Sequence, residues 1–473
     1  MIFTILRKEL VEVARDRRFV GLCAVLFVLS LAASIDGWNR IQADSAAREQ
    51  AVQADREIWH NQGDNNPHGA AHFARYAFRA LPVLAAFDPG VFDHAGAAFW
   101  MEAHTQNPTT LRRAEDVAVS VPFASLSPAW IIQVIATLAI AVLMFPAVAG
   151  EREQGTLRAL SGTGVSARSF AVGKAGAALV VVAALCGLSF ITALAPAVAQ
   201  GGFELPPARL GLMLLGYTLA LVAFAQMMLW LSARCASLAQ AFASAALVWF
   251  VLALAWPALA SQLALTVYPD EDEQALKNAI QLQANTPFWA GDAKEPAVAA
   301  LEAKVLADYG AETFDELGFD REALVLQAHE EFANTVYDRL YGELEATHAA
   351  QDTVLRYASL LSPVLALQRL SAGLAGTDLL AQQRFADQAE QHRRKIIEAL
   401  NRDMMENAGD AGFRYTADRR LWERTPDFVP QPPSLAEVMR HYSLEWMVVL
   451  LWLLAASRLA LRASARALGQ EVL

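Results

Sequence analysis

The residues of this chain whose types and spacing best suit chemistry are two histidines four positions apart. His68 and His72 would share one face of a helix, as paired metal ligands often do. His104 lies further along the same polar stretch, which also contains His60 and His94. The simpler interpretation is that these histidines cap and pack a loop-rich segment. We therefore predict no metal site, with His68, His72 and His104 as the candidates if one exists.

Motifs for catalysis are incomplete throughout the sequence. The segment Gly173-Lys174-Ala175 comes nearest to a nucleotide-binding loop, but it lacks the required first glycine and the serine or threonine after the lysine. The segment His329-Glu330-Glu331-Phe332-Ala333 begins like a zinc-protease helix and ends in alanine where the second histidine must be. No Gly-x-Ser-x-Gly elbow occurs. We predict no catalytic residues and no enzymatic activity.

A charged segment at 151–161, Glu-Arg-Glu-Gln-Gly-Thr-Leu-Arg-Ala-Leu-Ser, separates two long apolar runs. Gly155 allows a sharp change of direction, and Thr156 suits the N-cap of a following helix. Leu157 and Leu160 would share one face of that short helix. We expect a small amphipathic helix at the membrane surface that offers its leucine face to a partner. An ordinary polar loop is the alternative.

The sequence at 151–157 resembles the motif that follows the second span of ABC-2 type transporter permeases. In that family the acidic pair sits at the cytoplasmic mouth, and the Gly-Thr-Leu helix docks into a groove on a separate ATPase subunit. The resemblance implies ATPase-coupling roles for Glu151, Glu153, Gly155, Thr156 and Leu157. It also predicts that Gly155→Pro or Leu157→Asp abolishes coupled transport without preventing membrane insertion.

Composition indicates a membrane bundle combined with water-facing domains. The 473 residues are 55% hydrophobic and 18% charged, which is too apolar for most soluble proteins and too charged for spans alone. The net charge of −11 argues against a nucleic-acid partner. All three cysteines fall in or beside apolar runs, so the polar regions must be held together by packing rather than by disulfides.

We predict an all-α membrane protein with six transmembrane helices, an N-terminal amphipathic interfacial helix and two mainly helical extracytoplasmic domains. The predicted segments are a cytoplasmic amphipathic helix at 1–18, spans at 19–35, 128–149, 169–199, 209–232, 237–260 and 444–461, extracytoplasmic domains at 36–127 and 267–441, a cytoplasmic coupling helix at 150–166 and a cytoplasmic tail at 462–473. This order resembles an ABC-2 subgroup with two large external domains. Local stretches at 66–72, 87–91, 100–104 and 367–378 look like that subgroup too.

Polar residues at the span ends and interiors refine this prediction. Trp38 is expected to end the first span at interface depth. Pro146 should kink the second span, and Pro196 should break the third. Lys174 is expected to snorkel at the cytoplasmic end of the third span. Three glutamines within the spans are expected to make interhelical hydrogen bonds rather than to line a transport path: Gln133, Gln226 and Gln240.

Charge distribution sets the expected orientation. Basic residues cluster at both termini and at 152–174, and six spans place both termini on one side, so we predict cytoplasmic termini. The scarcity of charged residues in the spans argues against proton or sodium coupling. The resemblance implies a multi-pass protein of the bacterial cytoplasmic (inner) membrane whose large domains are periplasmic or extracellular.

The resemblance also sets the expected partners. It implies a separate ABC ATPase subunit that binds ATP and magnesium, so this chain would need no cofactor of its own. A second permease copy, or a related permease, would complete the exporter in the lipid bilayer, and an envelope partner could bind the external domains. The alternative is a membrane receptor or sensor whose external domains bind a solute. Its weakness is that the cytoplasmic segments are too short to hold an output domain.

Overall fold

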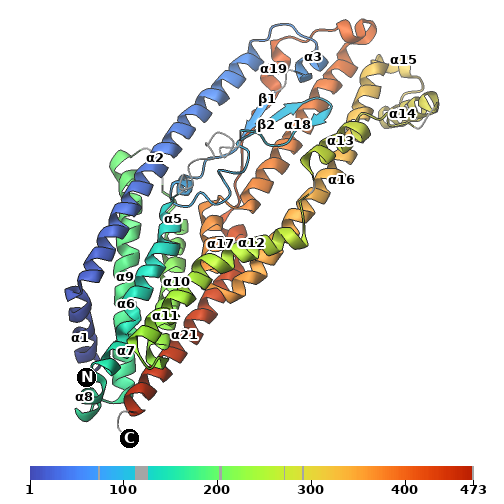
Figure 1. The fold of residues 1–473 in the computed structure, drawn as a ribbon. Coiled ribbons are helices and arrows are strands. Elements are labelled where there is room, and N and C mark those ends of the chain that lie inside the picture. The colour runs from blue at the N-terminus through green and yellow to red at the C-terminus, as the bar shows by residue number, and fades with distance from the viewer. Residues whose placement is uncertain (73–74, 112–125, 202–204, 271, 290–291, 471–473) are drawn as a thin grey trace.

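The computed structural model of the chain describes residues 1–72, 75–111, 126–201, 205–270, 272–289 and 292–470 (Figure 1). Within these ranges, six helices are long and apolar enough to cross a membrane. They are α2 (Arg17–His60), the run α5–α7 (Pro128–Glu153), α9 (Ala167–Gln200), α10 (Pro207–Arg234), the run α11–α12 (Leu238–Val267) and α21 (Ser443–Gln470). This confirms the predicted all-α membrane protein with six spans.

Two of the spans are composite helices. The first contains α5 (Pro128–Trp130), the π-helical η2 (Ile131–Ala136), α6 (Thr137–Met144) and α7 (Pro146–Glu153). The second contains α11 (Leu238–Phe250), the π-helical η3 (Val251–Ala255) and α12 (Trp256–Val267). The Ser127 hydroxyl caps the first of them by accepting from the Trp130 N–H at 3.1 Å.

Prolines act differently in two spans. Pro146 begins α7 just after α6 ends at Met144, so the helix is interrupted there as predicted. Pro196, by contrast, lies inside α9, and the prediction that it breaks the third span is wrong. A proline removes one backbone hydrogen bond, and transmembrane helices tolerate that loss when neighbouring groups satisfy the freed carbonyl.

The helix of the first span continues beyond the predicted end of the span, and the charged stretch at 39–59 is helical as its sequence predicts. α2 runs to His60 without interruption at Trp38. The Trp38 side chain is 2% exposed, and its indole N–H donates to the Ala193 carbonyl of α9 at 3.2 Å. The expected interface tryptophan is therefore a packing residue between two helices. A Cβ atom at Gly37 would lie 2.5 Å from the Ala86 carbonyl oxygen, so glycine is required for this close approach.

The first polar region combines the second half of α2 and shorter helices with a small sheet that the sequence did not indicate. After α3 (Pro67–His72), β1 (Arg75–Phe78), β2 (Ala98–Glu102) and β3 (Thr105–Gln106) form an antiparallel sheet in the order β1-β2-β3. Tyr76 of β1 lies opposite Trp100 of β2, and their rings stack. Large aromatic side chains favour such paired strands. The 3₁₀ turn η1 (Val83–Ala86) lies between β1 and β2.

The second polar region is helical, as predicted. The 3₁₀ turns are η4 (Ser359–Leu361) and η5 (Gly409–Arg414), and the helices are α13 (Glu273–Ala284), α14 (Lys294–Tyr309), α15 (Phe314–Leu317), α16 (Arg321–Ala358), α17 (Pro363–Ala375), α18 (Leu379–Asn407), α19 (Arg419–Arg424) and α20 (Leu435–His441). Apolar residues recur at every fourth position between 321 and 349 and predict a helix there: Leu324, Ala328, Phe332, Val336, Leu340 and Leu344. They belong to α16, which extends nine residues further.

The two polar regions share one hydrophobic core. Trp59, at the end of α2, meets Trp422 of α19 edge-on at 5.5 Å between ring centroids. The Trp59 indole N–H also donates to the Trp422 carbonyl at 3.1 Å. Further core residues come from both regions: Ala70, Ala77, Phe99, Met101, Phe385, Ile396, Leu400 and Leu421. Segments far apart in the sequence thus form a single folded body.

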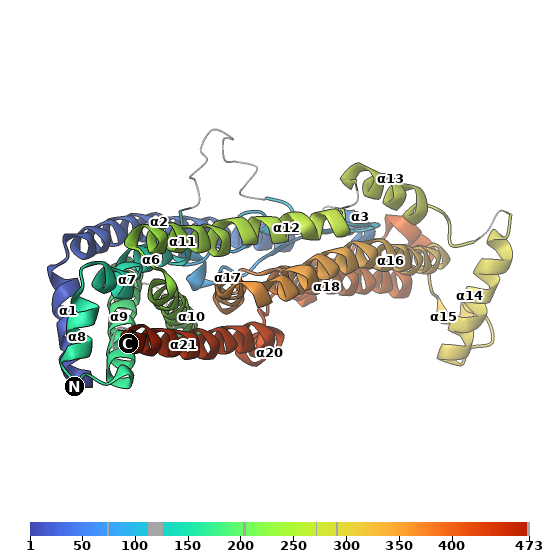
Figure 2. The ribbon, with the colours of Figure 1, turned by 60° about the horizontal axis from the view of Figure 1, so that its bottom comes forward.

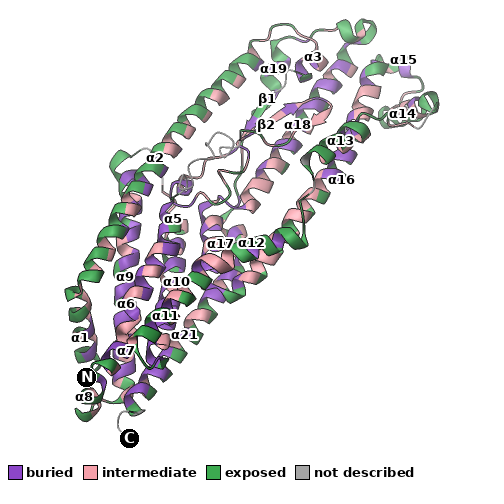
Figure 3. Cartoon of the chain, viewed as in Figure 1, coloured by how far each residue is buried: buried purple, intermediate pink, exposed green. Residues whose placement is uncertain are grey.

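The chain is elongated, with distinct ends (Figures 1 and 2). Both termini, α1 (Ile2–Arg15) and α8 (Thr156–Gly162) lie at one end, which we call the terminal end. The shared core with α3 and α19 lies towards the opposite, distal end. Helix α10 packs against α9, α17 and α21 and is largely buried, whereas α2 and α11–α12 expose more of their surface (Figure 3).

Large apolar side chains remain exposed on the outer helices. Phe27, Leu247 and Leu454 are 43%, 62% and 67% exposed. A soluble protein rarely exposes so many such residues along long helices, whereas lipid tails solvate them well. The exposed apolar surface therefore fits a multi-pass membrane protein.

Two of the three glutamines join neighbouring helices, as predicted. The Gln133 amide donates to the Tyr217 hydroxyl at 2.8 Å, and the Gln226 amide donates to the Ala175 carbonyl at 3.1 Å. Gln240 differs because its side-chain oxygen accepts from the Ala236 N–H at 2.9 Å, within the turn that precedes α11. The interhelical prediction is therefore wrong for Gln240.

A glycine on α17 allows the last span to pack. A Cβ atom at Gly373 would lie 2.1 Å from Cε2 of Tyr442, between α20 and α21. The Tyr442 ring cannot easily move, because it is buried and its hydroxyl donates to Asp378 at 2.6 Å. We expect Gly373→Ala to lower the free energy of unfolding by about 1–3 kcal/mol through overpacking. The thermal midpoint of the detergent-solubilised protein measures this loss.

Gly342, in the middle of α16, provides the matched control. A Cβ atom there would meet no other atom within 4 Å. Gly342→Ala should therefore raise stability by about 0.5–1 kcal/mol, since alanine favours the helix. Equal midpoints for the two variants would contradict the packing around Tyr442.

Candidate functional site

The charged segment between the second and third spans forms a sharp turn and a short helix at the terminal end. Helix α7 ends at Glu153, and Gly155 takes the left-handed conformation with φ 74°. Glycine adopts this conformation at little cost, which confirms the predicted change of direction. The two-turn helix α8 follows at Thr156–Gly162, and the Ser166 hydroxyl caps the start of α9.

Thr156 does not cap α8. Gly155 occupies the N-cap position and has no side chain to accept a hydrogen bond. The Thr156 hydroxyl instead donates to the Glu151 carbonyl at 3.2 Å. Thr156 therefore ties the start of α8 back to α7, and the predicted capping role is wrong.

The leucine expected to face a partner is buried within the chain. Leu157 has no exposed surface. It packs in a core whose other members come from α1, α7, α9, α10 and α21: Ile5, Val148, Phe170, Leu229, Ala233, Ala460, Ala463, Ala467 and Leu468. Leu160 is half-buried beside this core. The predicted leucine face is therefore wrong, because that face packs on the chain's own helices.

The outer surface of this turn is polar and exposed. Its exposed residues include Gln154, Gly155, Thr156, Arg158 and Ala159. We call these five residues the α8 surface. Because they are exposed, these residues could meet another protein without disturbing the leucine core.

A cluster of buried charges lies directly behind the turn. Lys174 of α9 is 3% exposed and lies 2.6 Å from Glu151 and 2.8 Å from Glu9. It also donates to the Ala147 carbonyl at 2.6 Å. Lys8 of α1 lies 2.5 Å from the same Glu151 oxygen that contacts Lys174. We call Lys8, Glu9, Glu151 and Lys174 the charge cluster.

The charge cluster corrects one sequence prediction. Lys174 does not snorkel, because its ammonium group is enclosed by carboxylates rather than by solvent. Glu151 pairs with the lysines of α1 and α9. The signal that could have identified this pairing is the lysine inside an apolar run, since a charge there usually has a partner.

Electrostatics favour the charged form of the α1 lysine. Burial alone would lower the pKa of Lys8, but its hydrogen bond to Glu151 and the charges of Glu9, Glu151 and Glu12 raise the pKa well above its usual value. The same lysine bridges a close group of carboxylates, Glu9, Glu12 and Glu151. Each of these carboxylates is therefore paired with a lysine of the chain itself.

The remaining charges of the motif hold α7 against the turn between α10 and α11. The Arg152 guanidinium donates to the carbonyls of Cys235 and Ala233, the latter at 3.1 Å. Glu153 accepts from the Leu238 N–H at 2.8 Å. The start of the fifth span is thereby tied to the end of the second. The Glu-Arg-Glu sequence thus joins α1, α7, α9, α10 and α11 into one unit behind the α8 surface.

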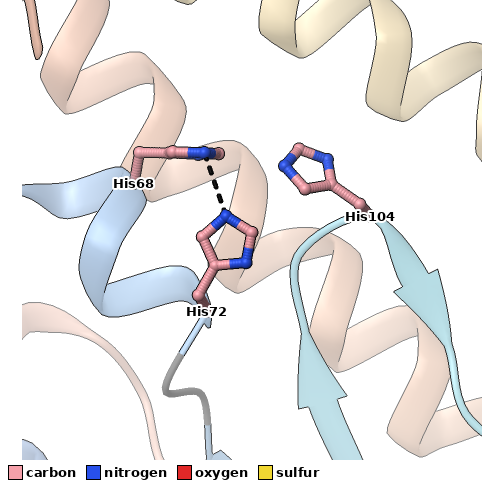
Figure 4. Close-up of side chains that lie close together, drawn as sticks. All are labelled: His68, His72 and His104. Atoms are coloured by element: carbon pink, nitrogen blue, oxygen red, sulfur yellow. Dashed lines mark hydrogen bonds between the residues drawn. The ribbon is translucent and has the colours of Figure 1, made fainter.

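The structure also brings together the three histidines named as metal candidates (Figure 4). The nearest ring nitrogens of His68, His72 and His104 all lie within 4.8 Å of one another, and the Nε2 atoms of His68 and His72 are 3.1 Å apart. Burial and the charges of His104 and His72 lower the pKa of His68 to about 4, so this ring is neutral at pH 7. His60 and His94 are not part of the group.

Comparison with known protein families covers most of the chain. Residues 3–288 match the family model described as ABC-2 family transporter protein. Residues 274–431 match a model described as a domain of unknown function, DUF3526. No curated protein matches the chain. The first match contains five of the six spans and the charge cluster, and the second contains most of the helical polar region.

Proposed function

Since the chain belongs to the ABC-2 family of transporter proteins, we propose that it is the permease of an ATP-driven exporter and is moved by a separate ATPase that binds the α8 surface. As a member of this family it is a multi-pass membrane subunit of a transporter. The sequence has no nucleotide-binding loop, so ATP and magnesium would bind to the partner.

The observation that carries this proposal is how α8 is attached. The helix projects a polar surface at the terminal end, while Leu157 and the charge cluster fix it to α1, α7, α9 and α21. Packed interiors transmit displacement because they deform little. A force applied to the α8 surface would therefore reach three or more spans without passing through a flexible linker.

The proposed orientation follows from the two ends. The α8 surface and both termini share the terminal end, where a cytoplasmic ATPase would bind (Figure 1). The shared core of the polar regions would then lie outside the cytoplasm, in the periplasm of a bacterial inner-membrane exporter. A second permease copy would face the exposed apolar side of the outer helices across the substrate path.

Variants of the α8 surface test the proposal. We expect Arg158→Glu and Ala159→Trp each to reduce the amount of co-purifying ATPase at least ~10-fold, because reversed charge or added bulk in an interface costs about 1.4 kcal/mol or more. Both side chains are exposed, so the thermal midpoint should stay unchanged. The measurement is affinity purification of the full chain from its native membrane, followed by quantification of bound ATPase and its ATP hydrolysis.

Arg420→Glu provides the control at the distal end, where the Arg420 side chain is 89% exposed. This variant should keep its ATPase. Normal ATPase binding and hydrolysis with both α8 variants would overturn the proposed contact. Impermeant thiol reagents acting on Arg158→Cys and Arg420→Cys from the same side of the membrane would overturn the orientation.

A further inference from the structure

Three imidazole rings converge at the distal end, from two separate elements. His68 and His72 lie one turn apart on α3, and His104 lies in the turn between β2 and β3. Figure 4 shows one ring nitrogen of His104 directed towards the other two rings. A hydrogen bond between His68 and His72 accounts for that pair but does not account for the approach of His104.

We propose that His68, His72 and His104 bind a divalent transition-metal ion, for which zinc is the best-matched probe. Neutral imidazole nitrogen is a preferred ligand of zinc, copper and nickel. Two histidine nitrogens on a tetrahedral zinc ion with bonds of 2.0–2.1 Å lie about 3.3 Å apart. The observed 3.1 Å for one pair, and at most 4.8 Å for the others, requires only small side-chain rotations.

The backbone at His104 is held in an uncommon conformation. His104 has φ 62°, in the left-handed region that residues other than glycine seldom adopt. Two contacts from α16 maintain it, because the His104 N–H donates to Glu330 at 2.8 Å and the Tyr337 hydroxyl donates to the His104 carbonyl. Such conformations occur preferentially at binding sites, where the surrounding structure fixes them. Here the result is to aim the ring at α3.

Glu330 supplies the partner that metal-bound histidines usually have. Its carboxylate oxygen lies 2.5 Å from Nδ1 of His104, and Glu330 is itself only 2% exposed. A carboxylate at Nδ1 favours the tautomer whose proton is on Nδ1, which leaves the Nε2 lone pair free for a metal. Glu330 is in turn 3.7 Å from the buried Arg393. Glu330 and Arg393 therefore hold the His104 ring on the side away from α3.

The site is open to solvent and incomplete by itself. His72 is exposed, and His68 and His104 are half-buried, so an ion can reach the three nitrogens from water. Three protein ligands leave a fourth tetrahedral position for water or for another donor, as in zinc sites that exchange ligands. A bound ion would also tie α3 to the β2–β3 turn, and through Glu330 to α16.

Metal titration of the full chain in detergent tests the proposal. We expect one Zn²⁺ per chain by calorimetry, and Co²⁺ in its place should give the visible absorption of a tetrahedral nitrogen-ligated site. His68→Ala, His72→Ala and His104→Ala should each weaken zinc binding about 100-fold, since each removes one of three ligands. His94→Ala is the matched control, because His94 is an exposed histidine of the same polar region, and its affinity should equal that of the unchanged protein.

A substitution at Glu330, which contacts His104 but would not bind the ion itself, tests whether the three histidines bind metal or only pack together. Glu330→Gln should weaken zinc binding ~10- to 100-fold, as loss of a carboxylate behind a ligand does elsewhere. His72→Ala gives the safest comparison of affinities, because this exposed side chain contributes little to folding. The proposal is overturned if zinc does not bind with one-to-one stoichiometry, or if the triple variant His68→Ala/His72→Ala/His104→Ala binds as tightly as the unchanged protein.

Discussion

Lys174→Met is expected to destabilise the protein by about 3–5 kcal/mol, the usual effect of removing one partner from a buried ion pair. The ammonium group of Lys174 contacts two buried carboxylates, Glu9 and Glu151, at 2.8 and 2.6 Å. Methionine fills the same space without the charge, so the loss reports electrostatics rather than a cavity. Lys8 alone would then face both carboxylates, so one negative charge would be left without a balancing cation. The measurement is the thermal and denaturant midpoint in detergent.

A double-mutant cycle with Glu151 makes this test specific. In Lys174→Met/Glu151→Gln one positive and one negative charge are removed together, so we expect the double variant to be less destabilised than the sum of the single variants. Arg168→Met is the matched control, since Arg168 lies on the same helix with an exposed side chain. Strict additivity of the two substitutions would show that the charge cluster contributes no coupling energy.

The spans could be predicted because their signals are local. A run of apolar residues about 20 long has few alternatives to a transmembrane helix, and Pro128 and Gly155 mark a start and a turn by their own backbone preferences. The helix predicted at 321–349 follows for the same reason, since its apolar residues recur every four positions, and α16 continues it to Ala358. The fold class therefore followed from residues that are neighbours in the sequence.

The packing of the charged motif could not be predicted in the same way. Whether Leu157 faces a partner or its own chain depends on α1 and α21, which are distant in the sequence. The position of Lys174 near the end of an apolar run predicts a snorkelling side chain. In the structure its ammonium group contacts Glu9 and Glu151 instead. In each case, the local sequence pattern predicts the helix but not which other helices pack against it.

At the distal end, too, local features could be predicted from the sequence and tertiary contacts could not. The four-residue spacing of His68 and His72 predicts a shared helix face, and that face is observed. The position of His104 beside these two histidines depends on the pairing of β1 with β2 and on Glu330, which lies 226 residues later in the sequence. Tertiary contacts of this kind leave no periodic signal in the sequence. The three histidines could therefore be named as candidates, but their proximity could not be predicted.

Leu157→Asp is expected to destabilise the protein by about 4 kcal/mol or more. The substitution removes a fully buried leucine, and losses of that kind cost about 2–5 kcal/mol. It also places a carboxylate among the side chains of Ile5, Val148 and Phe170, and the lysine beside Phe170, Lys174, is already paired with Glu9 and Glu151. We therefore expect loss of the folded, monodisperse protein in detergent, measured by size exclusion and by the thermal midpoint.

Two further variants of α8 test whether Leu157 is buried in the chain or faces a partner. Leu157→Met keeps the side-chain volume and should cost less than about 1.5 kcal/mol, with ATPase binding retained. Ala159→Asp puts the same carboxylate on the exposed side of α8 and should leave the thermal midpoint unchanged. A Leu157→Asp protein that folds normally and loses only its ATPase would contradict the buried position, because a leucine that faces the motor does not stabilise the chain. We therefore expect Leu157→Asp to unfold the protein rather than to uncouple it from the proposed ATPase. Uncoupling without unfolding is expected instead from substitutions at the exposed Arg158 and Ala159.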